Sequence, residues 1–329
     1  MYEPAANKYW YNYQGDKYFT PASNTKLATC YAAMKYLGDS LTGILKAEND
    51  TAVFFLPTGD PTLLHPDFKN QPIIEFLKNT HKKIYTTDGK WESAALGFGW
   101  SWDGYNEDYM AERSPLPVYG NTLKWIQDAA NTKEPPIIYS IPEVDWKVDF
   151  NPTNARFFSI QRNIGDNTYL LTQGKEKYKE LEVPFVTNGI TSALELLPDT
   201  INNKIELLSS EKFQQFIQKI NLTFNPVKTQ PTDSLLKITM HRSDNFFAEQ
   251  SLLMVSNKLL GAMSDEKIID TLLKTDYKDL PQKPKWVDGS GLSRYDLFTP
   301  QDFVTILNKM KNEFDFGRIK NILPTGNTG

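Results

Sequence analysis

The sequence has few of the residues on which several protein classes depend. Cysteine occurs once in 329 residues, at Cys30, so no disulfide can form within the chain. The three histidines, His65, His81 and His241, have no metal-ligand spacing, and we expect neither a metal nor another cofactor. No apolar run reaches about 18 residues, which predicts that no helix crosses a membrane.

Charge and motif content exclude further classes. The formal net charge of −4 at pH 7 argues against general binding to nucleic acid or to anionic membranes. The chain has no Gly-x-Ser-x-Gly elbow, no Gly-x-Gly-x-x-Gly and no Walker loop. An α/β-hydrolase site and the common nucleotide sites are therefore not expected. With 40% hydrophobic and 23% charged residues, the composition is that of a globular protein, and its length predicts at least two domains.

The segment over residues 18–38 predicts a short extended entry followed by a helix. Pro21 suits an entry turn, and apolar residues follow Ser23 at helical spacing up to Gly38, a typical helix stop. Ser23 and Lys26 are one turn apart, so their side chains can lie side by side. A lysine that is partly desolvated beside a serine hydroxyl can lose its proton and act as a base.

The Ser-x-x-Lys spacing is weak by itself. It recurs at Ser209, Ser234 and Ser264, and the ordinary interpretation of each is a solvated helix surface. The case for Ser23 rests on partners elsewhere in the chain. A Ser-Asp-Asn-x-x-Ala-Glu block begins at Ser243, and an Asp-Gly-Ser-Gly-Leu-Ser-Arg block begins at residue 288. Ser-x-x-Lys together with Ser-Asp-Asn is typical of penicillin-binding proteins and serine β-lactamases.

Together these blocks resemble one family, the D-alanyl-D-alanine carboxypeptidases of the penicillin-binding protein 4 type (low-molecular-mass class C). Pro-Ala-Ser-Asn-Thr-Lys from residue 21 and Gly-Asp-Pro-Thr-Leu from residue 59 are also similar to it, and the order is the family's. The resemblance covers nearly the whole chain. It implies an α/β (α+β) fold like that of penicillin-binding proteins and serine β-lactamases. An antiparallel sheet flanked by helices is then interrupted by a mostly β inserted domain.

We place the catalytic domain at residues 1–45 and 230–329, and the insert, with room for a nested smaller domain, at 46–229. Aromatic runs around Gly15 and Asp16 predict a β-hairpin over residues 9–20. Other expected elements are strands at 51–56 and 136–141, and helices at 73–79, 191–202, 210–220, 231–240, 246–260 and 299–311.

The family pattern gives each motif residue a role. Ser23 is the expected nucleophile and Lys26 its general base. Ser243 relays the proton between the base and the leaving amine, and Asn245 holds the substrate amide. The backbone amide of Ser23 supplies half of the oxyanion hole.

The family's third motif, Lys-Thr-Gly, does not occur in this sequence. The closing Asn-Thr-Gly at 327–329 lacks the lysine and, by resemblance, precedes the strand that carries the motif. We therefore expect the chain to stop before that strand, without the last strand and the C-terminal helix of the catalytic sheet.

A second group of residues suggests a site for a cationic side chain. Asp103 lies between aromatic residues, with Trp102 and Tyr109 as candidate walls. The resemblance implies that this pocket receives the ammonium of a diaminopimelate residue, and that Arg294 reaches the carboxylate of the same side chain. Ser290 is a further candidate substrate contact. The alternatives are a tryptophan-rich turn packed into the insert and a structural ion pair for Arg294.

The sequence thus predicts a serine DD-peptidase, a D-Ala-D-Ala carboxypeptidase or endopeptidase, that acts on peptidoglycan stem peptides through a Ser23 acyl-enzyme. β-Lactam antibiotics would acylate the same serine. The resemblance implies a periplasmic protein, exported by a signal peptide that this sequence does not include, with room for peripheral membrane or cell-wall association. Two alternatives stay open: a serine β-lactamase, which the long gap between Ser23 and Ser243 disfavours, and a non-catalytic peptidoglycan-binding relative.

Overall fold

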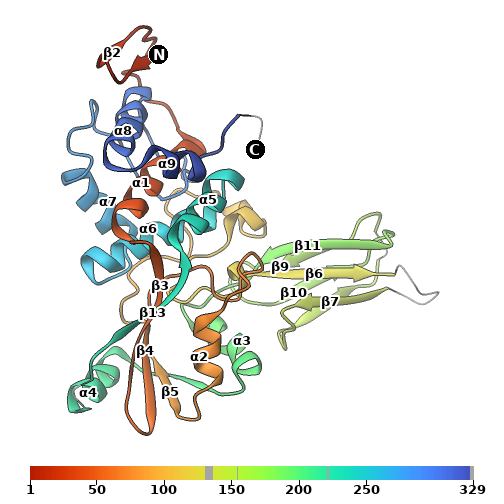
Figure 1. Cartoon of the computed structure of the whole chain (residues 1–329). Helices are drawn as coiled ribbons and strands as arrows, with labels where there is room; N and C mark the ends of the chain where they lie inside the picture. The colour runs from red at the N-terminus through yellow and green to blue at the C-terminus, as the bar shows by residue number, and fades with distance from the viewer. Residues whose placement is uncertain (130–135, 154, 221, 327–329) are drawn as a thin grey trace.

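The computed structural model describes residues 1–129, 136–153, 155–220 and 222–326. Figure 1 shows a helical body at the top, a sheet below it and a β lobe that projects to one side. The α/β class predicted from the sequence is confirmed.

Helix α1 (Lys26–Tyr36) lies at the centre of the helical body. Ala28, Cys30, Tyr31 and Met34, which point in different directions around the helix, are each no more than 3% exposed. The sequence suggested one apolar face, but a helix that is buried all round belongs inside a core. The helices around it are α5 (Thr232–Arg242), α6 (Asn245–Leu260), α7 (Asp265–Lys274), α8 (Pro300–Glu313) and α9 (Phe316–Ile322).

Side-chain caps fix where two of these helices begin. The Asp244 carboxylate accepts a hydrogen bond of 2.8 Å from the backbone N–H of Phe247, so α6 begins directly after Ser243. Thr299 and Asp302 form a reciprocal capping box at the start of α8, where the sequence predicted a helix.

The central sheet has the strand order β12-β5-β4-β3-β13 and is mixed. The β4–β5 and β5–β12 pairings are parallel and the other two are antiparallel. Phe55 on β4 packs with α2 and α3, whereas its neighbour Phe54 packs with α4, so β4 is buried on both faces. The bounds are β3 (Ser40–Glu48), β4 (Ala52–Pro57), β5 (Lys83–Thr86), β12 (Ile205–Leu207), β13 (Asn225–Pro231), α2 (Pro72–Lys78), α3 (Thr191–Ile201) and α4 (Ser210–Ile220).

Two three-stranded sheets form the projecting lobe (Figure 1). Their orders are β11-β6-β7 and β8-β10-β9, and Trp125 packs on Tyr169 between them with ring centroids 5.2 Å apart. The bounds are β6 (Thr122–Asp128), β7 (Ile137–Ile141), β8 (Val148–Asn151), β9 (Ser159–Arg162), β10 (Tyr169–Thr172) and β11 (Tyr178–Pro184).

The hairpin predicted over residues 9–20 is wrong. The N-terminal antiparallel pair is β1 (Tyr2–Glu3) with β2 (Lys8–Tyr9), and the aromatic side chains that follow stay largely exposed. Phe19 instead forms an isolated bridge with Phe298, which lies just before helix α8 in the sequence. Aromatic runs are typical of strands, but a strand needs a partner, and here the chain is tied to the helical body just before Ser23.

The predicted domain boundaries fall inside strands. Position 45 lies in β3 and position 229 in β13, and these two strands pair with each other. The division of the chain at 45 and 229 therefore stays a prediction. The closing Asn-Thr-Gly at 327–329 lies outside the described residues.

Within the described ranges, no helix combines the length and the apolar character needed to cross a membrane. The same part of the chain holds no group of three or more His, Cys, Asp or Glu side chains placed to bind a metal ion.

Candidate active site

Ser23 lies at the entrance to the central helix. It belongs to a short 3₁₀ turn, η1 (Ala22–Thr25), which runs directly into α1. Lys26 Nζ is 3.1 Å from Ser23 Oγ, the contact that the one-turn spacing predicts. Gly291 packs against this turn so closely that a Cβ on it would lie 1.9 Å from the carbonyl oxygen of Ala22. Glycine at this position therefore allows a distant segment to support the turn that presents Ser23.

Lys26 is buried, and no carboxylate of the described residues is in hydrogen-bond contact with it. Its side chain is surrounded by three acceptors: Ser23 Oγ, Asn245 Oδ1 at 2.7 Å and the carbonyl oxygen of Ser290 at 3.0 Å. The residue is 1% exposed. Burial lowers the pKa of Lys26 to about 8, although the more distant carboxylates of Glu249, Asp244 and Asp288 act in the opposite direction. An ammonium with this pKa is partly neutral near physiological pH, as a general base requires.

The break between α5 and α6 brings two further polar side chains to the same point. Ser243 ends α5 in the left-handed region, with a φ of 57°, and its Oγ donates a hydrogen bond of 2.7 Å to Ser23 Oγ. Asn245 opens α6 and, besides accepting from Lys26, donates through Nδ2 to the carbonyl oxygen of Tyr109 at 2.9 Å. The structure thus brings together Ser23, Lys26, Ser243 and Asn245, the four residues that the motifs predicted.

A cavity of about 260 Å³ opens beside Ser243 and Asn245. Charged side chains line it: Asp108 and Glu182 are carboxylates, and Arg242 forms a two-pronged pair with Asp67. His65 also lines the cavity, and burial lowers its pKa to about 4, so this imidazole is neutral.

The predicted cationic-group pocket is only partly assembled. Tyr109 lines the cavity and contacts Asn245 through its backbone. Trp102 is 74% exposed, and Asp103 accepts a hydrogen bond from Ser101, but neither is among the residues that line the cavity. Asp108, and not Asp103, contributes a carboxylate to the cavity wall. Its only sequence signal is that it directly precedes Tyr109.

Ser290 and Arg294 lie on the segment that supports the Ser23 turn. Ser290 is fully buried, and its contact with Lys26 is made by the backbone carbonyl. Its Oγ accepts from the backbone N–H of Leu292 at 3.3 Å. Arg294 is exposed, and its backbone N–H points to the carbonyl of Gly99. Direct substrate contacts by Ser290 and Arg294 stay predictions.

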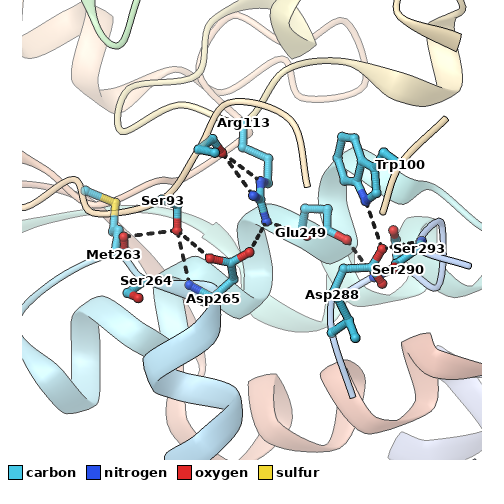
Figure 2. Close-up of polar contacts among 12 residues, drawn as sticks. Ser93, Trp100, Arg113, Glu249, Met263, Ser264, Asp265, Asp288, Ser290 and Ser293 are labelled. Carbon is cyan, nitrogen blue, oxygen red and sulfur yellow. Dashed lines mark hydrogen bonds and ion pairs between the residues drawn. The ribbon is translucent and has the colours of Figure 1, made fainter. Parts of the chain in front are cut away.

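A buried charge network around Arg113 and Glu249 was not predicted from the sequence (Figure 2). It reaches Lys26 through Ser290. Arg113 pairs with Glu249 at 3.1 Å and with Asp265 at 2.7 Å. The other oxygen of Glu249 accepts a hydrogen bond of 2.7 Å from the backbone N–H of Ser290. Glu249 ends the Ser-Asp-Asn-x-x-Ala-Glu block, which was the one available signal. No local pattern marks Arg113.

Known proteins resemble this chain in sequence pattern and in fold. The model of the D-Ala-D-Ala carboxypeptidase 3 (S13) family matches residues 3–329. The chain is similar to penicillin-binding protein 4 from Haemophilus influenzae, at 17% identity and a TM-score of 0.68 over 94% of this chain and 74% of that one. A structure of that protein with a novel β-lactam matches at 18% identity and a TM-score of 0.65, over 97% and 75% of the two chains. No curated protein gives a significant sequence match.

Proposed function

We propose a residue-level mechanism for this chain, which belongs to the D-Ala-D-Ala carboxypeptidase 3 (S13) family. The protein is a serine-type D-Ala-D-Ala carboxypeptidase, a hydrolase of cell-wall peptides. The two other readings of the sequence, a β-lactamase and a non-catalytic binding protein, are not favoured by this match.

In the proposed acylation step, neutral Lys26 takes the proton from Ser23 Oγ, and the oxygen attacks the carbonyl carbon of the penultimate D-Ala. The tetrahedral intermediate then collapses and the C–N bond breaks. Ser243 passes a proton to the departing amine, which leaves as D-Ala, and the rest of the peptide stays as an ester on Ser23. Water hydrolyses this ester with the same groups in reverse.

The observation that carries the proposal is the environment of Lys26. Its Nζ contacts Ser23 Oγ and Asn245 Oδ1 together, in a buried site where no carboxylate from the described part of the chain contacts it. A structural lysine on a helix surface would keep its ordinary pKa and its water. Burial instead favours the neutral amine, which is the form that can accept a proton.

For the substrate we propose a peptidoglycan stem peptide that runs past Asn245 into the cavity. Asn245 would hold the peptide amide, and the backbone N–H of Ser23 would stabilise the oxyanion. The carboxylates at the cavity wall would attract an ammonium on the stem-peptide side chain. Asp103 with Trp102, and Arg294, would act further out along the same peptide, whereas Ser290, which is buried beside Lys26, would act through its backbone carbonyl.

We further propose that β-lactams acylate Ser23, in a protein exported to the periplasm and associated with the cell wall. The β-lactam complex of the Haemophilus influenzae protein supports the first point for a protein of the same fold. Cleavage of cross-links, an endopeptidase activity, is an extension of the same chemistry because the amine that leaves would then belong to a second stem peptide.

Intact-protein mass spectrometry after incubation with benzylpenicillin tests the mechanism. The expected result is a mass gain of one penicillin per chain, which Ser23→Ala abolishes. The matched control is Ser209→Ala, which removes an exposed serine from another Ser-x-x-Lys pair and should label fully. Equal labelling of the Ser23→Ala protein would contradict Ser23 as the nucleophile.

A further inference from the structure

Two sequence blocks contain residues that the proposed chemistry does not use. One is the Ala248–Glu249 end of the block that begins at Ser243, and the other is the Asp288–Gly291 turn. Both are buried around Lys26: Glu249, Asp288 and Ser290 are each 0% exposed. Burying a carboxylate costs free energy unless it is paired or hydrogen-bonded. The partners of Glu249 and Asp288 therefore indicate which groups these carboxylates hold in place.

Glu249 links the inserted region to the catalytic lysine by a short chain of contacts. Its Oε2 accepts from Arg113 Nη1 at 3.1 Å, and its Oε1 accepts from the backbone N–H of Ser290 at 2.7 Å. The carbonyl of the same Ser290 accepts from Lys26 Nζ at 3.0 Å. Figure 2 shows Glu249 between the guanidinium on one side and Ser290 on the other.

The backbone around Ser290 is fixed on several sides. A Cβ on Gly289 would lie 3.0 Å from the carbonyl oxygen of Ala248, so the turn is packed directly on α6. Thr29 Oγ1, from α1, donates to the Gly289 carbonyl at 2.6 Å. Within the turn, Asp288 accepts from the backbone N–H of Gly291. A small movement of this backbone would move the acceptor that Lys26 uses.

We propose that Glu249 is a positioning residue for Lys26. Glu249 holds the Ser290 carbonyl against the lysine, and Arg113 in turn holds Glu249 in place. This inference rests on the proposed function, because it assigns Lys26 the role of base. Through Arg113, the inserted region would then contribute to the acylation step without contacting the substrate.

The charges around Lys26 predict the direction in which its pKa changes when the charge of Glu249 is removed. The charged groups that face Lys26 are the carboxylates of Glu249, Asp244 and Asp288, and each raises its pKa against the effect of burial. Burial, with the help of Asp288, raises the pKa of Glu249 to about 7, and Arg113 opposes this rise. Above neutral pH, Glu249 is therefore charged and favours the ammonium form of Lys26. Removing that charge must lower the pKa of Lys26.

The test compares Glu249→Gln and Glu249→Asp with the unmodified protein over a pH range. In Glu249→Gln, the pH midpoint of benzylpenicillin acylation should fall by on the order of one unit. The acylation plateau should fall by about tenfold, because the amide cannot accept from both partners. Glu249→Asp keeps the charge but is too short to reach both partners, so its plateau should fall while its midpoint stays near that of the unmodified protein.

Two further measurements separate positioning from a general loss of structure. The NMR titration of ¹³Cε-labelled lysine, assigned with Lys26→Arg, reports the pKa of Lys26 without any acylation. Asp265→Asn is the matched control, because Asp265 also pairs with Arg113 but contacts neither Ser290 nor Lys26. It should lower thermal stability and leave the midpoint unchanged.

The outcomes test the proposed function and the role of Glu249 separately. No acylation of the unmodified protein would count against the proposed function, and the NMR titration would still decide the role of Glu249. A normal midpoint and plateau in folded Glu249→Gln would overturn the inference. So would an equal midpoint shift in Asp265→Asn. If Glu249→Gln does not fold, an undiminished plateau in Glu249→Asp overturns it.

Discussion

Ser243 Oγ donates a hydrogen bond of 2.7 Å to Ser23 Oγ across 220 positions of sequence. The contact exists because Ser243 ends α5 in a left-handed conformation and turns its side chain towards the start of α1. Ser23 Oγ therefore has a hydroxyl on one side and the Lys26 amine on the other. In the proposed mechanism, this arrangement gives the proton a route from Ser23 to the leaving group.

Removing the Ser243 hydroxyl should slow acylation by about 10²–10⁴-fold, the usual contribution of a positioned proton-transfer group. Stopped-flow measurement of benzylpenicillin acylation checks this for Ser243→Ala and Ser243→Gly. Both variants should be equally slow, because both lack the hydroxyl. They should differ in stability, since glycine tolerates a φ of 57° and alanine does not. Slow acylation in the alanine variant alone would instead indicate a backbone effect.

Acylation should rise with pH around pH 8. The pKa of Lys26 is lowered to about 8, mainly by burial, and only the neutral amine accepts the Ser23 proton. The rate should follow a single ionisation on this limb, measured from about pH 6 to 9.5. A flat profile would exclude Lys26 as the base.

Lys26 should also make folding stability depend on pH. Its pKa is lower in the folded state, about 8 against 10.5, so the unfolded chain binds more protons between these values. Stability contributed by this group therefore rises as pH increases from 8 to 10.5. Urea unfolding of the unmodified protein and of Lys26→Met at pH 7.5 and 10 measures it. The unmodified protein should gain relative to the variant, by up to about 3 kcal/mol. An unchanged difference would show that the lysine is not desolvated.

The cavity should distinguish cationic from neutral stem-peptide side chains. Asp108→Asn or Glu182→Gln should lower kcat/KM for a D-Ala-D-Ala peptide with a free side-chain ammonium by about tenfold, roughly 1.4 kcal/mol of lost attraction. The N-acetylated peptide, which lacks the charge, is the control substrate and should be unaffected.

Asp103→Asn tests the pocket predicted from the sequence against the cavity seen in the structure. Asp103 does not line the cavity, so its substitution should have a smaller effect than that of Asp108. A larger effect at Asp103 would show that the ammonium binds outside the cavity, beside Trp102.

The proximity of Ser23, Lys26, Ser243 and Asn245 could be predicted because its signals are local. Ser23 and Lys26 are one helical turn apart, and Ser243 and Asn245 lie in one short block, so few letters carry the whole pattern. The other contacts of the site have no such local record. Arg113 and Glu249 meet across 136 positions, and nothing in the residues around Arg113 marks it as buried. The prediction of an N-terminal hairpin was wrong for a related reason. The sequence shows strand-like residues but not whether a partner strand exists.

Asp296 should be a source of instability at neutral and alkaline pH. Its Oδ2 is buried, and burial together with the nearby Asp288 carboxylate raises the pKa of Asp296 to about 9. Because this value lies above the ordinary 3.8, its stabilising contribution is complete below about pH 4 and is lost as pH rises through 9. Asp296→Asn, which stays neutral, should therefore gain stability relative to the unmodified protein between pH 5 and 8 in urea unfolding. Asp270→Asn, an exposed substitution on α7, should show no such gain. A constant difference between Asp296→Asn and the unmodified protein at both pH values would mean that the Asp296 carboxyl titrates normally.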